Sequence, residues 1–211
     1  MRLVVFGANG RTGREIVTQA LAAGHEVTAF VRDPGKAPGP RPGLRVLAGE
    51  VTSDQAAVRG AVDGQEAVLT AFGSPTTWHG VVSPTLTVQA VPLIVRAMRD
   101  AGVSRIVHLS AHGVGDTAAQ APAVYWAVYK ALGRMFADKD AGERILRDSG
   151  LDWTFVYPVM LVNGPRTGTY RVGEELRLGR VPRISRADVA DFMLRETTQR
   201  AYLRTTVQLA R

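Results

Sequence analysis

Three glycines stand three residues apart near the start of the chain, in the segment FGANGRTG at residues 6–13. They follow the apolar run at residues 3–6, which is typical of a buried strand. Glycine in a regular element costs about 0.5–1 kcal/mol relative to alanine, so this cluster needs a physical reason. Gly7 can turn the chain out of a strand, Gly10 can let the backbone approach a bound group, and Gly13 can let a helix pack closely on the sheet. The cluster therefore predicts a phosphate-binding turn.

A helix beginning at Arg11 would complete such a turn. Its first amides lack acceptors within the helix, and its dipole favours a phosphate at this end. Asn9 and Thr12 can brace the turn or bond the ligand. The spacing G-x-x-G-x-x-G differs from the dinucleotide fingerprint G-x-G-x-x-G, so an ordinary tight turn is the alternative interpretation. The position after the first strand of an alternating chain favours the pyrophosphate of a dinucleotide.

Arg32 lies nineteen residues after Gly13, at the end of the second apolar run. NAD-selective proteins usually have an acid near this position, on the ribose 2′-hydroxyl, whereas arginine suits the 2′-phosphate of NADP. Asp33 is the alternative, since its carboxylate can serve the hydroxyl if Arg32 points to solvent. A charge-assisted hydrogen bond contributes about 1.5–3 kcal/mol, so we favour NADP(H) over NAD(H). Arg11 or Lys36 can add to this site.

Other side chains capable of chemistry follow later apolar runs. Ser110 ends the run at residues 105–109, where its hydroxyl can bond a carboxamide or a substrate, or simply satisfy a loop backbone. His112 can donate a proton near neutral pH, with an ordinary loop histidine as the alternative. Trp78 and His79 can line a pocket for a flat substrate, or the tryptophan can cover a core edge. Ser110 and His112 are the candidate catalytic residues.

Short apolar runs alternate with longer segments of helical period, which is typical of a parallel sheet covered on both faces. Strands are predicted at residues 3–6, 27–31, 45–48, 67–71, 105–109 and 153–157. Helices are predicted at residues 11–23, 54–62, 84–101 and 124–149. Residues 34–43 are crowded with Pro and Gly and predict a loop. We predict one doubly wound, Rossmann-type α/β domain over residues 1–211, with ligands at the carboxyl ends of its strands.

The alternation ends after Pro158, where a stretch rich in Gly and Arg occupies residues 163–180. A helix then begins, with Ser185 as its predicted N-cap and Asp188 three residues later, as in a capping box. Late segments of open α/β sheets often close over the strand ends that bind ligands. We expect residues 158–211 to contribute a small lid on the substrate side.

The composition narrows the classes of function. The 211 residues are 45% hydrophobic, enough for a sizeable core. The absence of cysteine excludes disulfides and a thiolate nucleophile, and the four histidines give little basis for a metal site, so we predict none. The net charge of +7 comes from arginines scattered among acids, so we expect a small-molecule partner and no nucleic acid. The chain has no signal-peptide pattern and no apolar stretch near the ~20 residues of a membrane span, so we expect a cytoplasmic protein without a membrane partner.

Several segments together resemble the atypical short-chain dehydrogenases/reductases of the NAD(P)H-binding, NmrA-like type, and within them the flavin reductase/biliverdin-IXβ reductase group. The resemblance spans nearly the whole chain, in order: FGANGRTG, GHEVTAFVRDP, LAGEVTSD, AGVSRIVHLSA, ERILRDSGLDWTFVYP, GPRTGTYRV and ISRADVADFMLRE. It implies that the segment with Glu50 and Val51 lies by the adenine, and that Ser110 lies near the nicotinamide. It also implies that a segment passes the cofactor ribose, formed by Ala71, Phe72 and Gly73.

The chain departs from this family where a proton donor is usual. Typical short-chain dehydrogenases use Tyr-x-x-x-Lys, in which the lysine lowers the pKa of the tyrosine that passes a proton to the reacting oxygen. Tyr125 is followed four residues later by Tyr129, so Lys130 stands one place too far. The lysine that matches the family is Lys139, and Met135 stands four residues before it. An alcohol dehydrogenase or sugar epimerase with a tyrosine acid is therefore disfavoured.

Tyr157 and Pro158 stand where related chains often have arginine followed by proline. The resemblance implies that this pair contacts the cofactor, although a packed strand-end aromatic is the alternative for Tyr157. We predict an NADPH-dependent reductase that transfers hydride to a flat conjugated molecule such as a flavin, quinone or tetrapyrrole, with a proton from solvent or a serine. The alternatives are a non-catalytic NmrA-like sensor of NADP(H) and, more weakly, an NAD(P)-dependent epimerase or dehydratase. The sequence leaves the oligomeric state open.

Overall fold

Strands from both ends of the chain form one eight-stranded sheet in the computed structural model, which describes residues 1–72, 85–115, 117, 130–179 and 181–211. The strand order is β3-β2-β1-β4-β5-β6-β10-β8, and adjacent strands are parallel except β10 with β8. The strands are β1 (Arg2–Phe6), β2 (Glu26–Val31), β3 (Leu44–Ala48), β4 (Ala67–Thr70), β5 (Arg105–Leu109), β6 (Asp152–Pro158), β8 (Arg171–Gly173) and β10 (Thr205–Ala210). A separate parallel pair joins β7 (Met160–Val162) to β9 (Arg183–Ser185).

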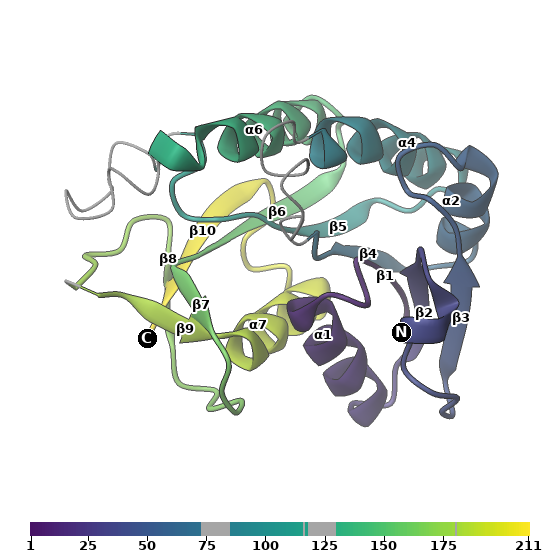
Figure 1. Cartoon of the computed structure of the whole chain (residues 1–211), viewed down its shortest axis with the longest axis horizontal. Helices are drawn as coiled ribbons and strands as arrows, with labels where there is room; N and C mark the ends of the chain where they lie inside the picture. The colour runs from purple at the N-terminus through teal and green to yellow at the C-terminus, as the bar shows by residue number, and fades with distance from the viewer. Residues whose placement is uncertain (73–84, 116, 118–129, 180) are drawn as a thin grey trace.

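Helices cover both faces of this sheet (Figure 1). One face carries α1 (Arg11–Ala22) and α7 (Arg186–Gln199), and the other carries α2 (Gln55–Val62), α4 (Leu86–Asp100) and α6 (Gly133–Arg147). A 3-10 turn, η1 (Pro34–Lys36), follows β2. Residues 3–6 are fully buried, with successive side chains in opposite core layers. Burial on both faces explains why this strand is apolar throughout and does not alternate with polar residues.

The predicted doubly wound fold is confirmed, and each of the six predicted strands is present within a residue or two. The helices predicted at 11–23, 54–62 and 84–101 correspond to α1, α2 and α4. The first part of the helix predicted at 124–149 lies outside the described residues, and its described part contains α6. Four strands, β7, β8, β9 and β10, were not predicted from the sequence. Three of these strands have only three residues, too few for a periodic pattern, and β10 carries the buried Gln208.

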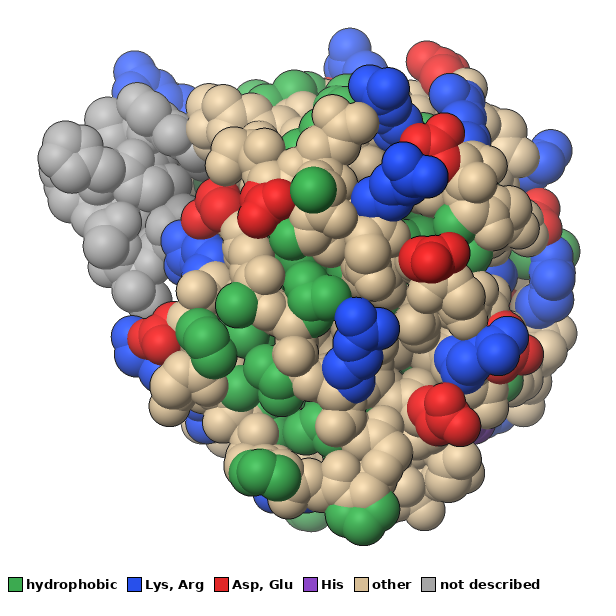
Figure 2. Space-filling model, turned by 90° about the vertical axis from the view of Figure 1, so that its right-hand side faces the viewer, with side chains coloured by type: hydrophobic (Ala, Val, Ile, Leu, Met, Phe, Trp, Pro, Cys, Tyr) green, Lys and Arg blue, Asp and Glu red, His purple; other side chains and the backbone are tan. Residues whose placement is uncertain are grey.

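Charges of both signs are interspersed on the face that includes the β3 edge of the sheet (Figure 2). Lys and Arg side chains there stand among Asp and Glu side chains and do not form a continuous basic stripe. Within the described ranges, no helix is both long enough and apolar enough to cross a bilayer.

A carboxylate on α6 caps the start of α4. Asp138 accepts hydrogen bonds from the amides of Thr87, at 2.9 Å, and Val88, at 3.0 Å. Thr85, the residue at the N-cap of α4, makes no capping hydrogen bond with its own side chain. Asp138 therefore satisfies amides that α4 leaves without partners and ties the two helices together.

Replacing Asp138 by asparagine should lower the free energy of unfolding by about 1.5–3 kcal/mol, because an amide keeps one acceptor and directs a donor toward the second N–H. Urea unfolding measures this loss. Asp148→Asn is the matched control, since Asp148 is exposed after the end of α6 and should change stability by less than about 0.5 kcal/mol. Equal stabilities of the two variants would show that Asp138 does not cap α4.

Candidate functional site

The three glycines form a turn that excludes a Cβ at Gly7 and Gly13 and leaves little room for one at Gly10. Gly7 has φ +83°, and a Cβ there would lie 2.5 Å from the carbonyl oxygen of Ala71. A Cβ on Gly13 would lie 2.1 Å from the carbonyl oxygen of Gly7. The amide of Gly10 donates to that same oxygen at 2.9 Å, and its Cβ would lie 3.1 Å from it. The turn therefore brings the start of α1 against the ends of β1 and β4, where the strand order reverses.

The first turn of α1 is the predicted anchor for a phosphate. Gly10 is its N-cap residue and provides no side chain to cap the helix. Thr12 is buried, whereas Arg11 is exposed. Amides at such an end are the donors that a phosphate accepts from, and a residue without Cβ leaves them accessible. The binding roles of these residues stay predictions.

Asn9 and Arg14 connect the glycine turn to the segment after β2. Asn9 Nδ2 donates to the carbonyl oxygen of Asp33 at 3.1 Å, so Asn9 braces the turn. The Arg14 guanidinium donates to the carbonyl oxygens of Asn9, at 3.2 Å, and Lys36, at 3.0 Å. Sequence reasoning missed Arg14, because only the tertiary structure brings these carbonyl groups to one side of α1. These hydrogen bonds hold the glycine turn and the loop after β2 together.

Arg32 and Asp33, which competed for the ribose position, have different surroundings. Arg32 is exposed directly after β2, and no described residue forms an ion pair or hydrogen bond with its guanidinium. Asp33 accepts from the amide of Gly35 at 3.0 Å and pairs with Lys36 Nζ at 3.1 Å. Lys36, followed by the Gly35 amide, holds the pKa of Asp33 below its usual value. Asp33 and Lys36 are therefore engaged with each other, whereas Arg32 is available to a ligand.

The family resemblance assigned two segments to the adenine and the ribose of the cofactor. They follow directly after β3 and β4. Glu50 is partly exposed and accepts from the hydroxyl of Thr52 at 3.2 Å, whereas Val51 is buried. The amide of Ala71 donates to the carbonyl oxygen of Phe6 at 2.8 Å, and Phe72 is 7% exposed. Five residues singled out from the sequence lie outside the described residues: Gly73, Trp78, His79, Tyr125 and Tyr129.

Ser110 and His112 lie beside the end of β6. The amide of Ser110 donates to the carbonyl oxygen of Val156 at 2.8 Å, and that of His112 donates to Pro158 at 3.1 Å. The two catalytic candidates are thus adjacent to the Tyr157–Pro158 pair. Burial lowers the pKa of His112, so its imidazole carries the extra proton less often near neutral pH than the sequence suggested.

The side chain of Tyr157 is buried in the core layer between the sheet and α6. It is 1% exposed, and its hydroxyl donates to the carboxylate of Glu143, a side chain with no exposed surface. This packing corresponds to the alternative interpretation of Tyr157, and its contact with a cofactor stays a prediction. Burial, and then the neighbouring Glu143, raise the pKa of Tyr157, which keeps the phenol protonated.

Lys139 and His108 complete a buried polar cluster around Glu143. Lys139 is 7% exposed, and burial lowers its pKa against the opposing effects of Glu143 and Asp138. His108 Nδ1 lies 2.7 Å from the hydroxyl of Thr70, and burial, followed by the charge of Lys139, lowers its pKa to about 3. His108 is thus a neutral, buried residue. Sequence reasoning missed Glu143, although its spacing of four residues from Lys139 places both on one face of the helix.

The segment predicted to form a lid is fastened to α7. Asp188 accepts hydrogen bonds from the amides of Thr167, at 2.6 Å, and Gly168, at 3.0 Å. Its own amide donates to the hydroxyl of Ser185 at 3.0 Å, which confirms Ser185 as the N-cap. Burial works to raise the pKa of Asp188, but the amides of Thr167 and Gly168 hold it below its usual value. The carboxylate therefore holds this loop in place, and its role over a substrate stays a prediction.

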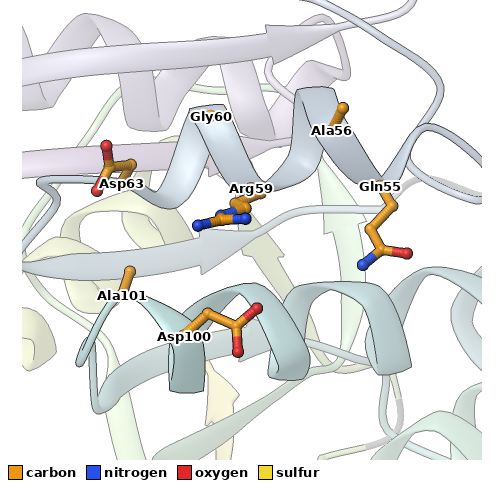
Figure 3. A pocket seen from close by; sticks show the side chains of 7 residues that line it. All are labelled: Gln55, Ala56, Arg59, Gly60, Asp63, Asp100 and Ala101. Atoms are coloured by element: carbon orange, nitrogen blue, oxygen red, sulfur yellow. The ribbon is translucent and has the colours of Figure 1, made fainter.

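A cavity of about 530 Å³ lies elsewhere, between α2 and the end of α4 (Figure 3). Arg59 and Gln55 extend into it from α2, with Asp63 and Asp100 at its rim. None of the site residues predicted from the sequence lines it. Among the described residues, no three His, Asp or Glu side chains gather as metal ligands would. The candidate site is therefore the carboxyl edge of β1 to β6.

A family model described as NAD(P)H-binding matches residues 7–200. Among curated relatives, an uncharacterized chloroplastic protein of Arabidopsis thaliana is 29% identical over 172 residues, which cover 79% of this chain. This chain spans only 61% of the length of that protein. YhfK of Bacillus subtilis, an uncharacterized sugar epimerase, is 24% identical over 206 residues, 96% of this chain and 92% of YhfK.

Solved structures share the fold over the whole chain. ChuY, an anaerobillin reductase of Escherichia coli O157:H7, has a TM-score of 0.82 at 21% identity, covering 99% of this chain and 96% of ChuY. A short-chain dehydrogenase/reductase of Veillonella parvula in complex with NADP has a TM-score of 0.83 at 17% identity, covering 100% of this chain and 94% of that one. At these identities the likeness shows the fold alone.

Proposed function

This chain belongs to the NAD(P)H-binding family, and from that premise we propose that it is an NADPH-dependent reductase of a flat conjugated molecule. The acceptor is of the flavin, quinone or tetrapyrrole type. The observation that carries the proposal is the glycine turn, where a Cβ on Gly7 or Gly13 would collide with backbone atoms. A turn with this requirement, placed at the reversal of the strand order, fits the pyrophosphate of a dinucleotide.

Each part of the carboxyl edge has a role in holding the cofactor. The amides at the start of α1 bind the pyrophosphate, and the exposed guanidinium of Arg32, which pairs with none of the described residues, binds the 2′-phosphate. The pairing of Asp33 with Lys36 supports NADPH over NADH, because Lys36 competes with a 2′-hydroxyl for the carboxylate. When bound, the dihydronicotinamide supplies the hydride. Ser110, at the end of β5, bonds the carboxamide or the acceptor.

A flat conjugated acceptor suits a chain that has methionine where the family pattern places the tyrosine acid. Met135 occupies the position four residues before Lys139, and Met135 is buried in α6. A carbonyl oxygen needs a proton from a well-placed acid, whereas a conjugated ring accepts hydride at carbon or nitrogen and spreads the resulting charge. Positioning of donor and acceptor then contributes most of the rate enhancement. The shared fold of ChuY supports a tetrapyrrole within this class.

A second candidate function is a non-catalytic sensor of NADP(H). The same absence of tyrosine at Met135 favours it, because a sensor needs no acid. In that case the cofactor would bind at the same glycine turn. A partner protein would then respond to the oxidation state of the cofactor.

The two functions differ in acceptor-dependent oxidation of NADPH. The near-ultraviolet absorbance of NADPH is followed with purified protein and a panel of flavins, quinones and biliverdin. We expect oxidation with at least one acceptor class, and a Ser110→Ala variant with a lower rate on that acceptor. Tight binding of NADPH without oxidation by any acceptor would contradict the reductase and favour the sensor.

A further inference from the structure

We propose that Arg14 is a positioning residue that sets the choice between NADPH and NADH. It holds the loop after β2 against the glycine turn, so that Lys36 stays paired with Asp33 beside Arg32. This inference deepens the proposed function and rests on it, because it concerns the cofactor site of the reductase. Arg14 acts through the loop and needs no contact with the cofactor.

A closed ring of hydrogen bonds joins three segments of the chain at this point. The Arg14 guanidinium donates through Nε to the carbonyl oxygen of Asn9, at 3.2 Å, and through Nη2 to that of Lys36, at 3.0 Å. The amide of Lys36 donates to the carbonyl oxygen of Asp33 at 3.2 Å. Asn9 Nδ2 donates to the same oxygen at 3.1 Å, which closes the ring. Arginine suits this bridge, because its planar fork presents several donors in a fixed geometry.

The loop depends on this ring for its position. Its 3-10 turn, η1, has three residues and none of them is buried, so packing contributes little to holding the turn. Within the described part of the chain, the hydrogen bonds that reach residues 33–36 from other elements come from Asn9 and Arg14. Asn9 anchors the beginning of the turn, and Arg14 anchors its end. Removing the Arg14 side chain therefore releases the end of η1, where Lys36 lies.

The position of Lys36 decides the charge beside Arg32. Lys36 Nζ lies 3.1 Å from a carboxylate oxygen of Asp33, the residue that follows Arg32. The two side chains are 74% and 52% exposed, and an ion pair this exposed contributes little free energy by itself. Its formation therefore depends on how the backbone places the two side chains. An Asp33 carboxylate without its lysine would repel the 2′-phosphate of NADPH and would accept from the 2′-hydroxyl of NADH.

The anchor for the pyrophosphate is less dependent on the Arg14 side chain. The glycine turn has backbone hydrogen bonds of its own, from the amide of Gly10 to the carbonyl oxygen of Gly7 and from the amide of Arg14 to that of Gly10, both at 2.9 Å. A substitution of the Arg14 side chain keeps these donors and acceptors. NADPH and NADH share the pyrophosphate and differ at the ribose 2′ position, so the substitution should act mainly on NADPH.

Calorimetric titration of Arg14 variants with both dinucleotides tests this role. In Arg14→Ala we expect Kd for NADPH to rise about threefold to tenfold and Kd for NADH to stay within about twofold. Arg14→Lys should behave like Arg14→Ala, because an ammonium keeps the charge but lacks the fork that bridges two carbonyl oxygens. Wild-type affinity of Arg14→Lys for NADPH would assign the effect to charge alone and overturn the proposal. An unchanged ratio of the two constants in Arg14→Ala would overturn it as well.

Arg41→Ala is the matched control for the loss of charge. Arg41 is exposed in the same connection between β2 and β3, but it precedes β3 and so lies near the opposite edge of the sheet. This variant should keep both dissociation constants within about twofold, since screened surface charges this far apart interact weakly. A loss of NADPH affinity equal to that of Arg14→Ala would show a general effect of charge and contradict the positioning role.

Trypsin cleavage of the cofactor-free protein reports on the loop itself. Trypsin cuts after Lys36, and a released loop opens this bond to the protease more often, so cleavage there should be about threefold to tenfold faster in Arg14→Ala. The rate should stay at the wild-type value in Arg41→Ala, and the urea midpoint should be the same in all three proteins. Equal cleavage rates in Arg14→Ala and the wild type would overturn the proposal. A wild-type protein that binds neither dinucleotide would instead overturn the reductase function, while the cleavage rates still decide whether Arg14 holds the loop.

Discussion

The Gly13→Ala variant should lose most of its affinity for NADPH and a substantial part of its stability. Its added Cβ would lie 2.1 Å from the carbonyl oxygen of Gly7 and 2.8 Å from the carbonyl carbon. Both atoms belong to the backbone, so either the turn or the start of α1 must move. Overpacking of this kind costs about 1–3 kcal/mol. If the same energy is lost from the anchor of the pyrophosphate, Kd for NADPH rises roughly tenfold to a hundredfold.

Gly60→Ala is the matched control for this variant. Gly60 lies within α2, at the cavity of Figure 3, and a Cβ there meets no atom within 4 Å. Alanine in a helix is favoured over glycine by about 1 kcal/mol, so this variant should be at least as stable as the wild type and bind NADPH equally well. Urea unfolding gives the stabilities, and quenching of tryptophan fluorescence gives Kd. A Gly13→Ala protein with wild-type affinity would exclude the turn as the phosphate site.

Replacing Arg32 by alanine should change the choice between the two dinucleotides. Loss of a charge-assisted hydrogen bond to the 2′-phosphate removes about 1.5–3 kcal/mol, which raises Kd for NADPH roughly tenfold to a hundredfold. NADH lacks that phosphate, so its Kd should change little. Arg59→Ala removes an exposed arginine from α2 and controls for the general loss of positive charge. An unchanged ratio of the two constants in Arg32→Ala would exclude Arg32 from this role.

Short sequence patterns were sufficient to predict the features that depend on residues close together in the chain. The glycine spacing predicted a turn whose collisions involve atoms only a few residues away, such as Gly13 against Gly7. The serine and aspartate of the predicted capping box lie three residues apart, and the structure has Ser185 and Asp188 in contact. The central strands followed from apolar composition, because helices on both faces make every position in them a core position.

Features that depend on distant residues were not accessible from the sequence. Nothing in the neighbouring residues marks Glu143, and only the packing of α6 over β5 and β6 shows that the Tyr157 hydroxyl donates to its carboxyl group. The competition between Arg32 and Asp33 was likewise open. The structure adds a 3.1 Å contact between Asp33 and Lys36, two flexible side chains whose pairing no spacing rule requires, and the preference between the two dinucleotides stays a prediction.

Isothermal titration calorimetry of the wild-type protein with NADPH and NADH tests the central claim most directly. The start of α1 and the Arg32 guanidinium should bind one NADPH per chain, with an affinity at least about tenfold higher than that for NADH. Absence of binding heat with both dinucleotides, at more than one temperature, would contradict the claim and the reductase function with it.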